Sequence, residues 1–74
     1  MYAIKHTTTG EYFTGRFLAV IVMKFMTEYK ASFQKDSPYI ACFKTEEKAK
    51  NFILTMQGHR WVDFPISELE AVEV

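Results

Sequence analysis

The N-terminal residues alternate with a period of two, and Tyr2, Ile4 and His6 fall on one side of that alternation. This period is typical of a β-strand. A Thr-Thr-Gly turn ending at Gly10 and a short returning stretch follow it, so the first fifteen residues predict a β-hairpin. Gly15 is expected to end or bulge the second strand of that hairpin.

The most apolar stretch runs from Phe17 to Phe25, and its centre is β-branched. An unbroken apolar run of this kind predicts a strand that is buried on both faces. We therefore expect a core strand near residues 17–25, followed by an irregular or extended stretch to Gln34. One helix over residues 17–34 is the alternative, because apolar residues there also recur at spacings of three and four, without Gly or Pro.

The clearest break in the chain is the Lys-Asp-Ser-Pro sequence that ends at Pro38. A proline does least harm at the first residue of a strand, because its missing N–H is not needed there. We therefore predict a short strand over residues 39–43. Its setting is apolar around Cys42, so the single thiol of the chain is expected to be buried and unreactive.

Residues 45–57 predict a helix. Thr45 is a typical N-cap residue, and Gly58 is a typical stop. The apolar residues at helical spacing form one stripe: Ala49, Phe52, Ile53 and Met56. Leu54 lies off that stripe on the polar side, where it is expected to be either a solvent-exposed leucine or an interface residue.

The C-terminal residues 69–74 predict a final strand, and Pro65 predicts a turn or bulge before it, because the apolar parity changes there. The order of elements indicates a single α+β domain over residues 1–74. In it, a small antiparallel sheet, with the hairpin and strands near 17–25, 39–43 and 69–74, packs on one helix over 45–57.

Apolar residues make up 49% of the 74 residues, which is generous for a small monomer and excludes disorder. The excess predicts that some apolar side chains are covered by a second copy or a partner. The net charge is zero, but residues 1–60 carry nine basic and five acidic side chains, whereas residues 61–74 carry four acidic and none basic. We expect the acidic tail to fold back beside the basic part.

The sequence contains no recognisable motif for catalysis, metal binding or nucleotide binding. The three glycines lie far apart, so a phosphate loop is not expected. His6, Cys42 and His59 lie on separate elements without metal-ligand spacing, and no nucleophile has an evident base. We therefore predict no catalytic residues, no metal and no cofactor, and a protein that is not an enzyme.

The sequence favours a binding surface over a catalytic site. Trp and Arg are enriched at the centres of protein interfaces, and both can stack on bases. The predicted interaction surface is Leu54, His59, Arg60, Trp61, Lys44 and Lys48. The alternatives are that Trp61 covers the core while Arg60 is solvated, and that the lysines form a solvated helix face.

The order of motifs resembles small uncharacterised proteins of bacteriophages and prophages of Gram-positive bacteria. The matching motifs are Tyr2-x-Ile4-Lys5, Tyr12-Phe13-x-Gly15, Ala41-x-Phe43-Lys44-Thr45-x-Glu47-x-Ala49 and the strand Leu69-Glu70-Ala71-Val72-Glu73-Val74. The resemblance covers about half the chain and leaves out residues 17–38. It implies an accessory protein of the host cytoplasm, without a mechanism or functional residues.

Two functions remain open at this point. The first is a non-enzymatic protein-binding accessory domain that acts on a host or defence protein or forms a homodimer. The second is a small nucleic-acid-binding protein that uses Lys44, Lys48, Lys50, Arg60 and Trp61, although the neutral charge does not favour it. We expect a cytoplasmic location and no membrane partner, because the longest apolar run is far shorter than the roughly 20 residues that span a bilayer.

Overall fold

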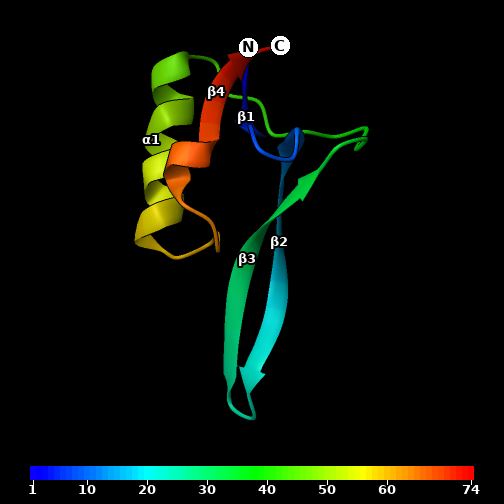
Figure 1. The fold of residues 1–74 in the computed structure, drawn as a ribbon, viewed down its shortest axis with the longest axis vertical. Coiled ribbons are helices and arrows are strands. Elements are labelled where there is room, and N and C mark those ends of the chain that lie inside the picture. The colour runs from blue at the N-terminus through cyan, green and yellow to red at the C-terminus, as the bar shows by residue number, and fades with distance from the viewer.

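The computed structural model describes all 74 residues as a four-stranded antiparallel sheet with one helix against one face (Figure 1). The strands are β1 (Tyr2–His6), β2 (Glu11–Met23), β3 (Met26–Gln34) and β4 (Leu69–Glu73), and their order in the sheet is β3-β2-β1-β4. The helix is α1 (Glu46–Gly58), and a 3-10 turn (Ile66–Glu68) precedes β4. The predicted α+β class is confirmed.

The helix forms as its pattern predicts. The Thr45 hydroxyl accepts a hydrogen bond from the Lys48 amide at 3.2 Å, which satisfies one of the free amides of the first turn. The apolar stripe of α1 packs on β1, β2 and β4 to form a core of six buried residues: Ile4, Phe13, Ala49, Ile53, Met56 and Leu69. Only nine of the 74 residues are buried, so this core is thin for the amount of apolar side chain in the chain.

The sheet divides after Tyr12. Strands β1 and β2 pair only at Lys5–Tyr12 and His6–Glu11, and β2 then diverges from β1. Because β4 pairs along the whole of β1, Phe43 occupies the other side of β1 at Tyr2, where it makes two backbone hydrogen bonds of 2.8 and 2.7 Å. Beyond the division, β2 and β3 continue together as a two-stranded ribbon that projects from the rest of the molecule (Figure 1).

A β-bulge lies where the ribbon leaves the sheet. The β2–β3 register shifts between Phe13 and Phe17, and Gly15 inside this interval has a φ of 85°. Left-handed backbone is accessible to glycine without a steric penalty, and a bulge bends and twists its strand. The predicted bulge at Gly15 is therefore confirmed, although the strand continues through it to Met23.

The prediction for residues 17–34 was correct on the backbone and wrong on burial. Residues 17–23 belong to a strand, which rules out the alternative of one long helix. The irregular or extended stretch expected up to Gln34 is extended, as the strand β3, which pairs with β2 from Met26 onward. The expected burial on both faces is wrong, because residues 17–29 are all exposed. No other helix or strand covers residues 18–29, the outer part of the ribbon.

Two expectations for the segment before α1 are wrong as well. The strand predicted over residues 39–43 is reduced to the single bridge at Phe43. Cys42 is exposed rather than buried, with its Sγ 3.7 Å from the Ile40 carbonyl oxygen. Ala41 and Phe43 on either side of Cys42 pack against the core, and the alternation of side chains along an extended segment turns Cys42 to solvent.

The C-terminal part folds as predicted. The 3-10 turn directly after Pro65 produces the change of apolar parity, and the last strand extends to Glu73. The acidic tail folds back as expected, because β4 pairs with β1 and the Asp63 carboxylate lies 2.8 Å from Lys30 Nζ.

The molecule is less compact than a typical monomer of its size. Its accessible surface is 5305 Å², whereas a compact monomer of 8.7 kDa exposes about 4,700 Å². Its Cα radius of gyration is 12.4 Å, against about 11 Å for a compact domain of this length. The projecting ribbon accounts for this excess and makes the molecule 41 Å long.

Candidate functional site

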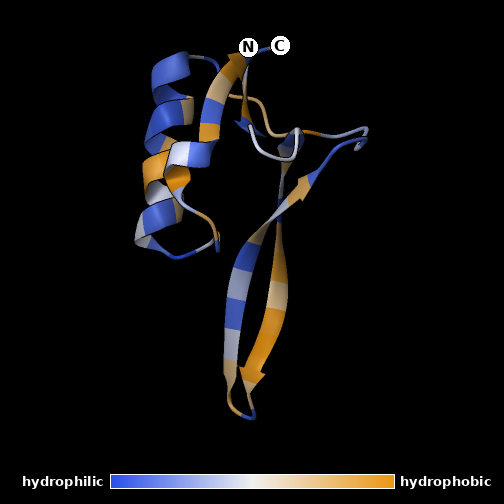
Figure 2. Cartoon of the chain, viewed as in Figure 1, coloured by the Kyte–Doolittle hydropathy of each residue, from blue (hydrophilic) through white to orange (hydrophobic).

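The most unusual feature of the surface is the end of the β2–β3 ribbon. We call residues 18–29, which lie beyond the Phe17–Ala31 pair, the arm. All twelve arm residues are exposed. Eight of the thirteen large hydrophobic residues that the chain exposes lie in the arm: Leu18, Val20, Ile21, Val22, Met23, Phe25, Met26 and Tyr29. Figure 2 shows this as a continuous hydrophobic stretch on the β2 half of the arm.

The apolar side chains of the arm lie on both of its faces. Residues opposite each other in an antiparallel pair point to the same face. The Ile21–Thr27 and Ala19–Tyr29 pairs therefore share the face of the Phe17–Ala31 pair, whereas Leu18 and Val20 lie on the other face, opposite Lys30 and Glu28. Ile21 is 78% exposed on the first face and Leu18 is 58% exposed on the second. Neither face of the arm is covered by its own chain.

The base of the arm is joined to the segment that follows α1. The indole of Trp61 packs edge-on against Phe17, with ring centroids 4.7 Å apart, and stacks on His59 at 4.6 Å. The Ala31 amide donates a 2.8 Å hydrogen bond to the Trp61 carbonyl oxygen. These contacts close the outer edge of β3 at the base, so the arm is free only beyond Lys30.

Lys30 completes this junction. Its Nζ lies 2.8 Å from Asp63 Oδ1 and donates a 3.0 Å hydrogen bond to the Arg60 carbonyl oxygen. The hydrogen bond to Asp63 is the main reason that the pKa of Lys30 is raised, and the charge of Glu28 adds to it. A cavity of about 250 Å³ lies beside the junction, between residues 27–29 of β3 and residues 59–61.

Farther out, the edge of β3 is open. Since the Ala31 amide points away from β2, the alternation of an antiparallel ladder turns the amide and carbonyl groups of Tyr29 and Thr27 outward as well. These groups make no hydrogen bond within the chain. The arm therefore offers a partner both apolar side chains and free backbone groups.

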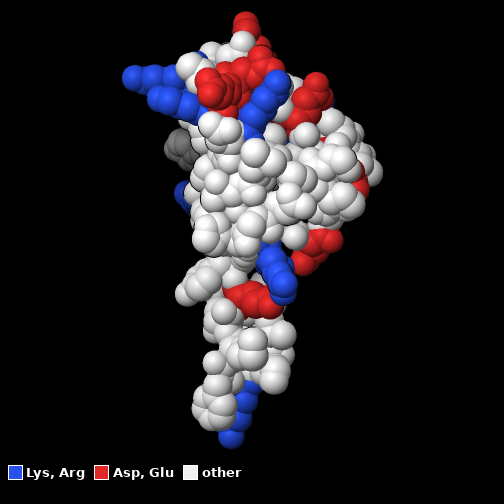
Figure 3. All heavy atoms as spheres, turned by 90° about the vertical axis from the view of Figure 1, so that its left-hand side faces the viewer, with Lys and Arg blue, Asp and Glu red and all other residues white.

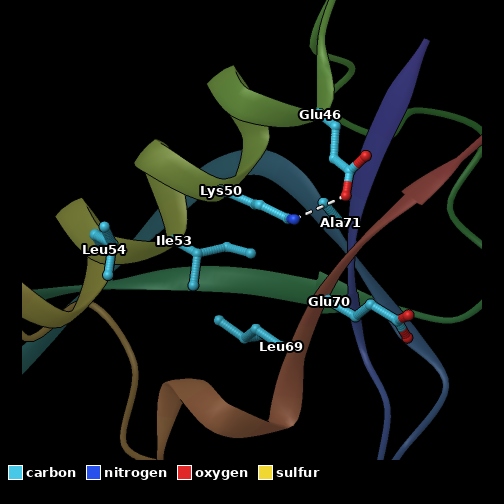
Figure 4. Close-up of a pocket in the computed structure, with 7 residues that line it drawn as sticks. All are labelled: Glu46, Lys50, Ile53, Leu54, Leu69, Glu70 and Ala71. Atoms are coloured by element: carbon cyan, nitrogen blue, oxygen red, sulfur yellow. Dashed lines mark ion pairs between the residues drawn. The ribbon is translucent and has the colours of Figure 1, made fainter.

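A second open feature is the groove between α1 and β4, which has a volume of about 450 Å³ (Figure 4). Its apolar lining is Ile53, Leu54, Leu69 and Ala71. At one end, Lys50 and Glu46 form an ion pair of 2.8 Å across one turn of α1. Hydrogen bonding to Glu46 raises the pKa of Lys50. Leu54 is 60% exposed at the other end, so the groove is apolar and open to solvent there.

A buried histidine cluster lies at the turn between β1 and β2. The His6 ring is nearly inaccessible, with Nε2 2.9 Å from Glu68 Oε1 and Nδ1 3.0 Å from Thr9 Oγ1. It stacks on Phe64 at 4.0 Å, and Thr8 donates a 2.9 Å hydrogen bond to the same Glu68 oxygen. The hydrogen bonds from His6 and then Thr8 lower the pKa of Glu68.

This hydroxyl–imidazole–carboxylate order resembles that of nucleophilic catalysts. However, none of the cavities is lined by His6, Thr9 or Glu68. The Thr9 oxygen is also engaged by the Glu11 amide at 3.3 Å. We therefore assign the cluster a structural role, which is to hold the β1–β2 turn against the start of β4. Sequence reasoning missed it because His6 and Glu68 are 62 residues apart.

The residues predicted as an interaction surface do not gather in one place, because they lie toward opposite ends of α1. His59, Arg60 and Trp61 gather at the base of the arm, and Leu54 lines the groove. Lys44 and Lys48 are exposed near the N-terminal end of α1, a helix about 18 Å long. The basic residues therefore do not form one surface with Trp61. Figure 3 shows charged side chains of both signs gathered at the end of the molecule opposite the arm.

Other ligand chemistry is not prominent. No three or more His, Cys, Asp or Glu side chains gather closely enough to hold a metal ion. No helix in the structure has the length and apolar character needed to cross a membrane. Comparison with protein-family models, curated proteins and solved structures finds no match to this chain.

Proposed function

We propose that this chain is a non-enzymatic protein-binding domain and that the arm is its binding surface. The observation that carries the proposal is the exposure of apolar side chains on both faces of a two-stranded ribbon. A two-stranded hairpin is marginally stable in water by itself, so a ribbon of this length gains order when a partner covers it.

The size of the apolar surface supports the same function. The eight large arm residues expose between 43% and 91% of their areas, which amounts to roughly 1,000 Å². The largest apolar patch on a typical monomer is about 300–600 Å². The arm exceeds that range, as expected of a surface that is buried in a complex.

The charge of the arm favours a protein partner over a nucleic acid. Lys24 and Glu28 are its only ionisable residues apart from Tyr29, so the arm has no excess of positive charge. Nucleic-acid binding requires basic side chains that neutralise phosphates. In Figure 3 most of the arm is uncharged, consistent with a surface that is recognised through apolar packing.

The proposal includes the biological setting implied by the sequence resemblance, that of an accessory protein encoded by a phage or prophage and active in the cytoplasm of the host. In that setting, the partner is either a host or defence protein or a second copy of the chain. A gene position among phage structural or lysogeny genes is the expected finding. A position inside a conserved operon of bacterial housekeeping genes would contradict this setting.

The binding role is tested by site-specific photo-crosslinking in the expressing cell. A photo-reactive amino acid replaces Val22 in the arm, or Tyr39 on the body as the matched control, because both side chains are well exposed. The expected result is a discrete protein adduct from position 22, identified by mass spectrometry, and none from position 39. Equal adducts at both positions, adducts to nucleic acid only, or no adduct at position 22 would refute the role of the arm.

A further inference from the structure

We propose that the partner of the arm is a second copy of this chain, and that two copies exchange arms about a two-fold axis. In this arrangement, Phe25 at the tip of each arm inserts into the groove between α1 and β4 of the other copy. The inference rests on the proposed function of the arm as a protein-binding surface and adds the identity of the partner and the site that receives the tip.

The first argument is area. A stable protein interface buries about 800 Å² on each partner, and the arm presents roughly 1,000 Å² of apolar surface. The surface of this chain already exceeds that of a compact monomer by about 600 Å². Burying the arm on a second copy therefore removes the excess exposure and supplies an interface of the size that a dimer needs.

The second argument is that both faces of the arm need cover. A single flat partner surface covers Ile21 and Tyr29 on one face, or Leu18 and Val20 on the other, but not all four. A second copy supplies two apolar surfaces, its own arm and its own body. With two-fold symmetry, each arm lies between the arm and the body of the other copy, and every contact is made twice.

The third argument is the match between the tip and the groove. Phe25 is 91% exposed, the highest value among the exposed large hydrophobic residues. The groove is lined by four apolar side chains and by the charged residues Glu46, Lys50 and Glu70. Its volume of about 450 Å³ lies within the range of roughly 300–1,000 Å³ of small-ligand pockets. It is therefore large enough for a phenyl ring.

Phe25 cannot reach the groove of its own chain. The tip lies at one end of the 41 Å long axis, whereas α1 and β4 lie near the other end (Figure 1). Charge is compatible with the exchange, since neither Lys24 beside Phe25 nor Glu70 on the β4 side of the groove has an ion-pair partner within the chain. An inserted tip brings Lys24 to the edge strand that carries Glu70.

The test combines sedimentation with disulfide trapping in a Cys42→Ala background, which removes the natural exposed thiol. Two proteins, one with Phe25→Cys and one with Leu54→Cys, are mixed and oxidised. The expected product is a disulfide-linked heterodimer of the two proteins. The matched control replaces Leu54→Cys by Tyr39→Cys, which is also exposed but lies away from the groove, and it should give little product.

The unmodified chain should sediment at twice its 8.7 kDa mass. Phe25→Ala and Leu54→Asp should each raise the dimer dissociation constant at least about tenfold. A dimer without the 25–54 crosslink would overturn the arm exchange. A monomer that still gives arm-specific crosslinks to another protein in cells would overturn this inference and leave the proposed function standing. A monomer with no such crosslinks would overturn both.

Discussion

The indole of Trp61 lies edge-on against the ring of Phe17, with centroids 4.7 Å apart and ring planes at 62°. Phe17 is the last β2 residue before the arm, and Trp61 follows α1, where it also packs near Phe52 at 6.0 Å. The pair therefore connects the arm to the only helix. No hydrogen bond or ion pair joins residues 18–29 to residues outside β2 and β3. The orientation of the arm therefore depends mainly on this junction and on Lys30.

Trp61→Ala is expected to reduce the free energy of unfolding by about 2 kcal/mol, because it removes a half-buried aromatic side chain from between α1 and β2. In a double-mutant cycle with Phe17→Ala, the coupling should be about 1 kcal/mol. Urea denaturation at fixed protein concentration measures both. Tyr39→Ala, at an exposed position with no aromatic contact, should change stability by less than about 0.5 kcal/mol. Equal losses of unfolding free energy in Trp61→Ala and Tyr39→Ala would contradict a stabilising role for the junction.

Arg60→Gly is expected to stabilise the chain by about 1 kcal/mol. Arg60 has a φ of 56°, and the bonds from the Arg60 amide to the Gln57 carbonyl and from the Trp61 amide to the Met56 carbonyl form a Schellman motif. A left-handed backbone costs a non-glycine residue roughly 1–2 kcal/mol. Arg60→Ala keeps that cost, so it should match the natural chain in thermal unfolding. Equal effects of the two substitutions would show that the gain does not come from the backbone.

Gly15→Ala is expected to destabilise the chain by about 1–2 kcal/mol, because Gly15 has a φ of 85° and an added Cβ would lie 3.4 Å from the Cβ of Ala41. Gly58→Ala is the matched control. Gly58 ends α1, and its added Cβ would meet nothing within 4 Å, so stability should rise by about 0.5–1 kcal/mol. Chemical denaturation of the two variants should therefore give changes in unfolding free energy of opposite sign. Changes of the same sign would contradict the bulge geometry at Gly15.

Low pH is expected to reduce the stability of the folded chain through protonation of Glu68. Its pKa is lowered from the usual 4.5 by the hydrogen bonds from His6 and Thr8. A depressed carboxylate pKa stabilises the folded state above the unfolded pKa, and this contribution is lost as pH falls below 4.5 and through the folded pKa. Glu68→Gln should flatten this acid-side loss in a series of unfolding measurements from pH 7 to pH 3.

The control for the acid-side loss is Asp36→Asn, since the exposed Asp36 carboxylate makes no hydrogen bond or ion pair in the structure. Asp36→Asn should keep the full loss of stability at low pH. An unchanged slope in Glu68→Gln would indicate that the His6–Glu68 contact contributes nothing to the acid sensitivity.

Cys42 is expected to react with a thiol reagent in the folded protein, because its side chain is exposed. The reaction should proceed at a rate near that of the urea-unfolded chain, measured by absorbance or mass spectrometry. If Cys42 reacted only after unfolding, the thiol would be buried, as the apolar sequence around it predicts.

The sequence by itself determined the elements whose signals are local. A cap at Thr45 and a stripe ending at Met56 specify α1, because the pattern of one helix face contains enough information to place it against a sheet. The first hairpin and the last strand follow from a period of two and from turn residues. The surplus of apolar side chains is also evident from composition alone.

Only the tertiary structure decided which face of each strand is covered. An apolar run such as residues 17–23 gives a strand, but it contains no information on whether another element will lie against it. Here the divergence of β2 from β1 after Tyr12, with Phe43 in the vacated place, leaves that run in solvent. Contacts between distant residues, such as His6 with Glu68 and Phe17 with Trp61, depend on chain topology, which local periodicity does not encode.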